Sequence, residues 1–98
     1  MRAIVTVLGK DRVGITANVC ALLAKYDINI LDITQTILQE YFTMVMLVDT
    51  SACPVSVGEM RDILEKDGQE QSLSIRIQRE DIFNAMHRIR LFYRQQAG

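Results

Sequence analysis

The chain is poor in residues that interrupt or cross-link a fold. Its 98 residues include one proline, five glycines and no tryptophan. The two cysteines, Cys20 and Cys53, are too few for a disulfide framework, which favours a reduced, cytoplasmic setting. No apolar run approaches the roughly 20 residues that span a membrane. The N-terminus shows no signal-peptide pattern, so we expect neither export nor membrane insertion.

An excess of charge of one sign is also lacking. The 11 basic and 12 acidic residues give a net charge of −1, which does not indicate a broad basic surface for nucleic acid. With one histidine and two distant cysteines, a metal site has weak support, and no cofactor is expected. A local cluster could still contact nucleic acid, although a helix-end charge bias or a protein contact is preferred: His87, Arg88, Arg90 and Arg94.

What is present suits a single small globular domain over residues 1–98. Apolar residues make up 49% and charged residues 23% of the chain, close to the average for globular proteins. A core of this size is marginal and would gain from association. We therefore expect a homodimer or a higher homo-oligomer.

Hydrophobic spacing predicts four strands, two intervening helices and a final helix. The strands at 2–8 and 41–49 are apolar on both faces, which is typical of central strands, whereas 72–79 alternates and suits an edge. Irregular spacing near Leu31 and Asp32 indicates a β-bulge. The expected elements are strands at 2–8, 28–39, 41–49 and 72–79, and helices from Ile15 to near Asp27, from Ser56 to Gly68, and over 81–95.

The helix ends carry local signals of different kinds. Ser56 and Glu59 fit a capping box at the start of the second helix. Asp11 is predicted to cap the first helix by accepting a bond from a backbone N–H group. Gly68 is predicted to end the second helix.

The order strand–helix–strand–strand–helix–strand predicts an α+β, ferredoxin-like sandwich with an extra C-terminal helix. Right-handed crossovers give an antiparallel sheet order of 4-1-3-2, with strands numbered along the chain and both helices on one face. The other face still carries Ile4, Leu8 and part of the apolar set at 42–48. Because apolar surface of that size should not face water, the final helix or a second subunit must cover it.

The loop from Gly9 to Gly14, between the first strand and the first helix, is the candidate functional site. A helix N-terminus presents unpaired N–H groups and a partial positive charge, so a carboxylate or a phosphate is its natural guest. The glycines allow the main chain to approach a ligand or to turn with positive φ. These residues predict a binding loop without identifying what it binds.

Residues 9–15, followed after one helix by residues 27–30, resemble the ACT domain family of small amino-acid-sensing regulatory modules. The resemblance covers about residues 2–79, and the final helix lies outside the usual module. The chain is most similar to free-standing, single-domain ACT proteins and is similar to the ACT modules of the glycine cleavage system repressor. The family usually has proline before the second glycine, where this chain has Val13, which costs some rigidity at the helix start.

The resemblance implies a non-enzymatic regulator that senses an amino acid at a dimer interface and acts through a partner protein. The ligand would lie between the loop of one subunit and the start of the second strand of another. Backbone N–H groups of 12–15 would bind its carboxylate, and Asp11 or the Asn29 amide oxygen would accept from its ammonium group. The implied ligand-binding residues are Gly9, Lys10, Asp11, Arg12, Val13, Gly14, Ile15, Asn29 and Ile30.

Each polar residue in this set also has an ordinary structural role. Asp11 could simply cap a helix, Asn29 could satisfy a strand end, and Lys10 and Arg12 could be solvated loop charges. Two other function classes stay open. One is an interaction module without a ligand. The other, less favoured, is an acylphosphatase-like hydrolase using Arg12 and Asn29, although that family's glycine-rich arginine signature is absent from 9–15.

Overall fold

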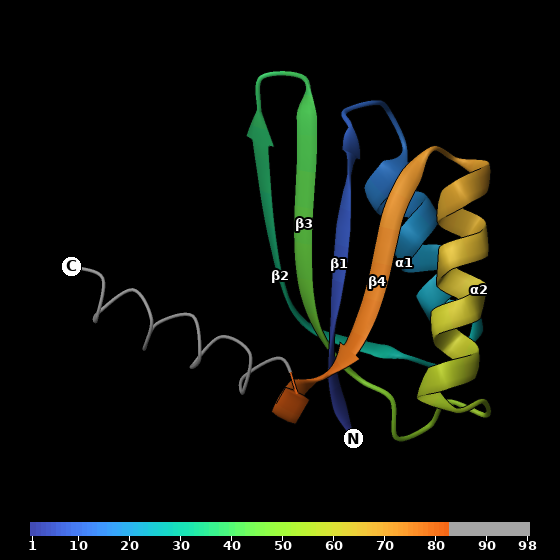
Figure 1. Cartoon of the computed structure of the whole chain (residues 1–98). Helices are drawn as coiled ribbons and strands as arrows, with labels where there is room; N and C mark the ends of the chain where they lie inside the picture. The colour runs from blue at the N-terminus through green and yellow to red at the C-terminus, as the bar shows by residue number, and fades with distance from the viewer. Residues whose placement is uncertain (83–98) are drawn as a thin grey trace, which may run out of the picture.

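The computed structural model describes residues 1–82 of the chain. Figure 1 shows the main chain and its six elements. A short helical turn at 80–82 ends the described part, so the helix predicted over 81–95 falls almost entirely outside it. The elements are β1 (Arg2–Lys10), α1 (Ile15–Lys25), β2 (Asn29–Leu38), β3 (Tyr41–Asp49), α2 (Val57–Glu70) and β4 (Leu73–Arg79).

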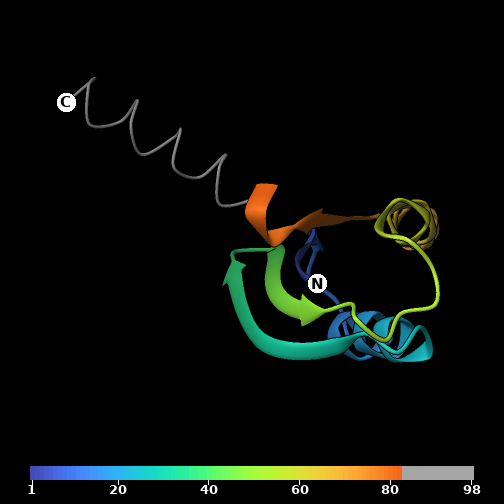
Figure 2. The ribbon, with the colours of Figure 1, turned by 90° about the horizontal axis from the view of Figure 1, so that it is seen from below.

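The strands form one antiparallel sheet in the order β2-β3-β1-β4. This order is the predicted 4-1-3-2 arrangement, and β1 and β3 are central, as their two apolar faces indicated. Both helices lie on the same face of the curved sheet (Figures 1 and 2). The predicted ferredoxin-like architecture is therefore confirmed.

The core lies between the helices and the sheet face that they cover. Every second residue of the central strands points into it, which is the period-two pattern of a strand. Among residues 1–82 no polar or charged side chain is buried. The core consists of Ala3, Val5, Val7, Ile15, Val19, Leu23, Ile28, Phe42, Met44, Met46, Val48, Met60, Leu64, Leu73, Ile75 and Ile77.

The predicted cap is confirmed for α2 and wrong for α1. Ser56 Oγ accepts a hydrogen bond from the Glu59 N–H group at 3.1 Å, which begins α2 as the capping box predicted. At α1 the N-cap residue is Gly14, with φ of 91°, and no side chain caps it. Asp11 lies too early to cap because β1 continues through Lys10 and the loop begins only after it.

The prediction that Gly68 ends the second helix is also wrong. α2 continues to Glu70, and Gly68 is buried inside it. A Cβ atom at Gly68 would lie 2.6 Å from the Leu73 carbonyl oxygen and 3.2 Å from Ile75 Cγ1. Gly68 is therefore the point where α2 packs closely on β4, and the left-handed turn after the helix falls at Ser72, with φ of 59°.

Strand β2 differs from β4, the other edge of the sheet, in how much of it is exposed. All its residues except Ile30 are exposed, whereas β4 buries alternate side chains. The predicted bulge is confirmed by a register shift between Ile30 and Asp32 in the pairing with β3. The exposed apolar side chains of β2 include Ile37, which is 58% exposed, and Leu38, which is 71% exposed. β2 is thus an apolar edge strand with unpaired backbone groups.

Candidate functional site

The loop at 11–14 is anchored on both sides, at the upper end of the sheet in Figure 1. The Asp11 N–H group donates to the Glu40 carbonyl oxygen at 2.7 Å, which fixes the loop to the β2–β3 turn. The Arg12 guanidinium donates to the Gln71 carbonyl oxygen in the α2–β4 turn. Val13, between these anchors and the helix, is fully exposed. Contacts to two other turns therefore set the course of the loop.

The start of α1 carries no compensating group among the described residues. Gly14 offers no side chain, and the first helical turn holds no acidic residue. The Asn18 N–H group donates to the Gly14 carbonyl oxygen at 2.9 Å, so the helical ladder begins there. The N–H groups of 15–17 precede that ladder and keep the partial positive charge of the helix end. The helix start is therefore uncapped, and its binding of an anion stays a prediction.

The two glycines and Ile15 of the predicted set have different surroundings. Gly9 lies inside β1, and the space where its side chain would be is filled by the Leu73 side chain, so Gly9 serves packing between β1 and β4. Gly14 takes the left-handed conformation that glycine allows, and a Cβ atom there would contact only Asn18 Nδ2, at 3.8 Å. Ile15 is 1% exposed because its side chain lies in the core, which leaves only its N–H group for a ligand.

The second part of the predicted site, residues 29–30, lies at the other end of the sheet. Asn29 pairs with Asp49, which in turn pairs with Arg2, whereas the loop follows Lys10 at the opposite end of β1. Eight residues of strand separate the two levels, a distance of roughly 26 Å. One chain alone therefore does not bring the loop and Asn29 together.

Sequence inspection missed the surface that does lie beside the loop. Thr16 Oγ1, in the first turn of α1, is 3.4 Å from Gln35 Oε1 on β2. Ile33 and Ile37 flank Gln35 on the same face of β2 and are 37% and 58% exposed. The sequence could have indicated this surface, because residues 33, 35 and 37 alternate along an edge strand and so lie on one face. The start of α1 thus lies next to an exposed apolar stretch of β2.

A hollow borders the other side of the loop. It has a volume of about 460 Å³ and lies between the loop and the α2–β4 turn. Lys10, Asp11 and Arg12 give it charges of both signs, although Arg12 already donates to Gln71. Gln71 and Ser72 complete its lining.

The geometry gives no support to the hydrolase alternative. Arg12 lies in the loop and Asn29 lies at the far end of the sheet, so the two side chains that such an enzyme would use are not brought together. Within residues 1–82 no group of three or more His, Cys, Asp or Glu side chains could hold a metal ion. The same residues contain no helix that is long and apolar enough to cross a membrane.

Comparisons with known proteins agree with the fold. The ACT domain family model matches residues 2–78. A UPF0237 protein of Clostridium acetobutylicum is 54% identical over 89 residues, which are 91% of this chain and 100% of that protein. The solved structure of an ACT domain protein from Streptococcus pneumoniae has a TM-score of 0.76 and 42% identity, covering 85% of this chain and 93% of that one.

A more distant likeness extends to larger proteins. A putative glycine cleavage system transcriptional repressor has a TM-score of 0.67 at 24% identity, and the match covers 79% of this chain and 44% of that one. At this identity the likeness shows the fold alone. The family model, the close relative and the pneumococcal structure together confirm the resemblance inferred from residues 9–15 and 27–30, and the chain belongs to the ACT domain family.

Proposed function

We propose that this chain is a non-enzymatic, cytoplasmic regulator in which two copies pair through β2 and bind a small amino acid at their interface. The observation that carries the proposal is the uncapped N-terminus of α1 beside an exposed edge strand. The ACT family membership adds the precedent of regulatory modules. The free thiols of Cys20 and Cys53 fit a reducing compartment.

Antiparallel pairing of β2 with a second β2 would complete the predicted site. In such a pair the beginning of one strand lies beside the end of the other. Asn29 of one copy would then approach Leu38 of the other, and with it the α1 start that Thr16 and Gln35 hold near that end of β2. The apolar side chains of Ile33 and Ile37 would be buried in the same step, which favours association.

The ligand chemistry follows from the groups that meet there. The N–H groups at the start of α1 suit a carboxylate, because they are unpaired and share the positive end of the helix dipole. Asp11 of one copy or the Asn29 amide oxygen of the other would accept from an ammonium group. Ile30, half-buried at the start of β2, would limit the size of the ligand side chain.

Regulation would act through a separate protein. A ligand that bridges two copies changes how they pack only if it binds one arrangement more tightly than another, typically by about 1–3 kcal/mol. The exposed apolar stretch of β2 also favours a second candidate, an interaction module that pairs through β2 without a ligand. Titration calorimetry against a panel of amino acids separates the two, because an interaction module gives no heat with any of them.

The sharpest test places a carboxylate of the protein where the ligand carboxylate would bind. Ala17 is exposed in the first turn of α1. Ala17→Glu should stabilise the helix start by roughly 0.3–1 kcal/mol and should weaken binding of the amino acid at least tenfold, because the new side chain competes for the same N–H groups. Calorimetry on the variant measures the affinity.

Ala21→Glu is the matched control, because Ala21 is exposed in the middle of α1, away from its N-terminus. It should bind the amino acid as the unmodified chain does. Equal affinity in both variants would show that the α1 start does not hold the ligand carboxylate.

A further inference from the structure

The sheet face away from the helices carries an aliphatic stripe. Ile4 and Leu47 are paired across β1 and β3, and Leu8 and Val45 continue the stripe toward the loop end of the sheet. Leu8 is 49% exposed and Val45 is 37% exposed in the described chain. We call these four side chains the open-face stripe. Aliphatic groups at the centre of a sheet are normally covered.

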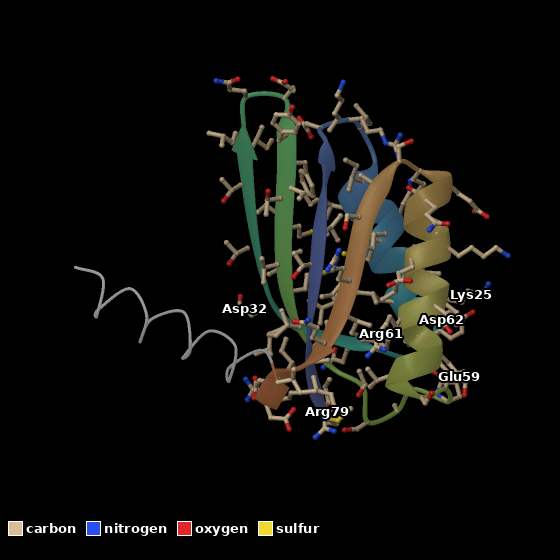
Figure 3. The ribbon with its side chains drawn as sticks, viewed as in Figure 1. Lys25, Asp32, Glu59, Arg61, Asp62 and Arg79 are labelled. Atoms are coloured by element: carbon tan, nitrogen blue, oxygen red, sulfur yellow. The ribbon has the colours of Figure 1, made fainter. Side chains whose placement is uncertain are left out.

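The chain leaves the described part of the molecule at one end of this stripe. After β4 it turns at 80–82 on the side of the sheet away from the helices (Figures 1 and 2). Arg2 Nη2 lies 2.8 Å from Glu80 Oε2, and Arg79 Nη2 lies 2.8 Å from Asp81 Oδ2. Arg79 marks this corner in Figure 3. These ion pairs hold the turn at 80–82 beside the Ile4 end of the open-face stripe.

The sequence beyond the exit has the length and the pattern to cover the stripe. Sixteen residues follow Ile82, and as a helix they would extend about 24 Å, while the stripe from Ile4 to Leu8 needs about 13 Å. Apolar residues recur there at helical spacing, at Met86, Ile89 and Tyr93.

The comparisons indicate that at least part of this segment is shared with a similar relative. The match to the Clostridium acetobutylicum protein includes 89 residues of this chain, more than the 82 that the structure describes, so it reaches past Ile82. The ACT family model ends at residue 78. The segment thus continues the chain beyond the general family module.

We propose that residues 83–95 fold back over the open face of their own sheet, with Met86 and Ile89 against the open-face stripe. Because the segment is attached at the turn at 80–82, its effective concentration at this face is about millimolar. A second copy of the chain would have to reach a higher concentration to displace it. The segment therefore occupies the open face and leaves β2 for association. This inference does not depend on whether a ligand binds.

The test is methyl NMR on the full chain. Nuclear Overhauser effects should join the methyl groups of Leu8 and Val45 to the methyl groups of Met86 and Ile89. A mixed sample of labelled and unlabelled chains separates contacts within one chain from contacts between chains. We expect the contacts within one chain, and protection of the Leu8 and Val45 methyl groups from a soluble gadolinium chelate.

Two glutamine variants sharpen the result. Ile89→Gln places a polar group on the apolar side of the segment and should expose the Leu8 and Val45 methyl groups to the chelate. Arg88→Gln introduces glutamine at the neighbouring position, which is already polar, and should leave the Leu8 and Val45 methyl groups protected. Contacts only between chains would assign the face to a second copy, and full chelate exposure in the unmodified chain would show the face uncovered. Either result overturns the inference.

Discussion

At the scale of single residues, a small polar cluster holds the N-terminus against the end of β3. The Met1 carbonyl oxygen accepts from the Thr50 N–H group at 2.8 Å, and the Met1 ammonium donates to Ser51 Oγ at 2.8 Å. The Ser51 hydroxyl and N–H groups both donate to Asp49 Oδ1, at 2.5 and 2.9 Å. The cluster is solvent-exposed, so its pairwise energies are small.

The pKa of Asp49 reports directly on this cluster. The Ser51 hydroxyl, the Ser51 N–H group and the nearby N-terminal ammonium lower the pKa of Asp49 below its ordinary value of 3.8. Because the folded state has the lower pKa, the stabilisation from Asp49 is present above pH 3.8 and is lost as the pH falls through the folded value. Ser51→Ala should raise the pKa of Asp49 toward 3.8, as measured by NMR titration of its carboxyl carbon. Ser74→Ala, on β4, should leave it unchanged.

At the scale of elements, close packing of α2 against β4 depends on the absence of one side chain. Gly68 lies inside the helix although glycine is a poor helix former there, and the approach of Leu73 explains its presence. Backbone oxygen cannot move aside as a flexible side chain can. The contact between the two elements therefore outweighs the local preference of the helix.

Two glycine-to-alanine variants in the same helix test this balance. Gly68→Ala should lower the free energy of unfolding by roughly 1–2 kcal/mol, because overpacking costs more than alanine gains in helix propensity. At Gly58 a Cβ atom would have only Ser56 Oγ nearby, at 3.9 Å, so Gly58→Ala should be neutral or stabilising by up to about 1 kcal/mol. Urea unfolding at one protein concentration measures both. A stabilised Gly68→Ala protein would contradict the packing argument.

At the scale of the whole molecule, antiparallel topology separates the two parts of the candidate site. The loop follows the end of β1, whereas Asn29 begins β2 beside the level where β1 starts. The loop and Asn29 lie at opposite ends of the sheet, and a rigid sheet cannot bring them together within one chain. Only association can bring the two parts together, and the exposed edge at β2 offers the surface for it.

Association through β2 predicts a specific sensitivity to charge. Ile37→Lys places an ammonium group within the proposed interface and should shift the protein to monomers in sedimentation equilibrium, with ligand affinity falling in parallel. Ser74→Lys, which is exposed on the opposite edge strand, should leave the dimer intact. A dimer that survives Ile37→Lys and dissociates with Ser74→Lys would place the interface at β4.

The sequence by itself determined the element order, the central and edge strands, the bulge near Leu31, the α2 cap and the family. These features depend on periodicity and on residues close together along the chain, which act the same way before and after folding. The loop between β1 and α1 was located for the same reason, and its role in binding stays a prediction. Local chemistry could not show that Gly9 and Gly68 serve packing against β4, that Arg12 donates to Gln71, or that β1 continues past Gly9.

Only the tertiary structure decided which distant residues meet. Leu73 fills the space at Gly9, and Thr16 meets Gln35, because the strand register and the helix placement bring them together. The same register keeps Asn29 away from the loop. Strand register is set by the packing of the whole core, because shifting a strand by one residue would turn its apolar side chains outward. No short segment of sequence therefore specifies the register.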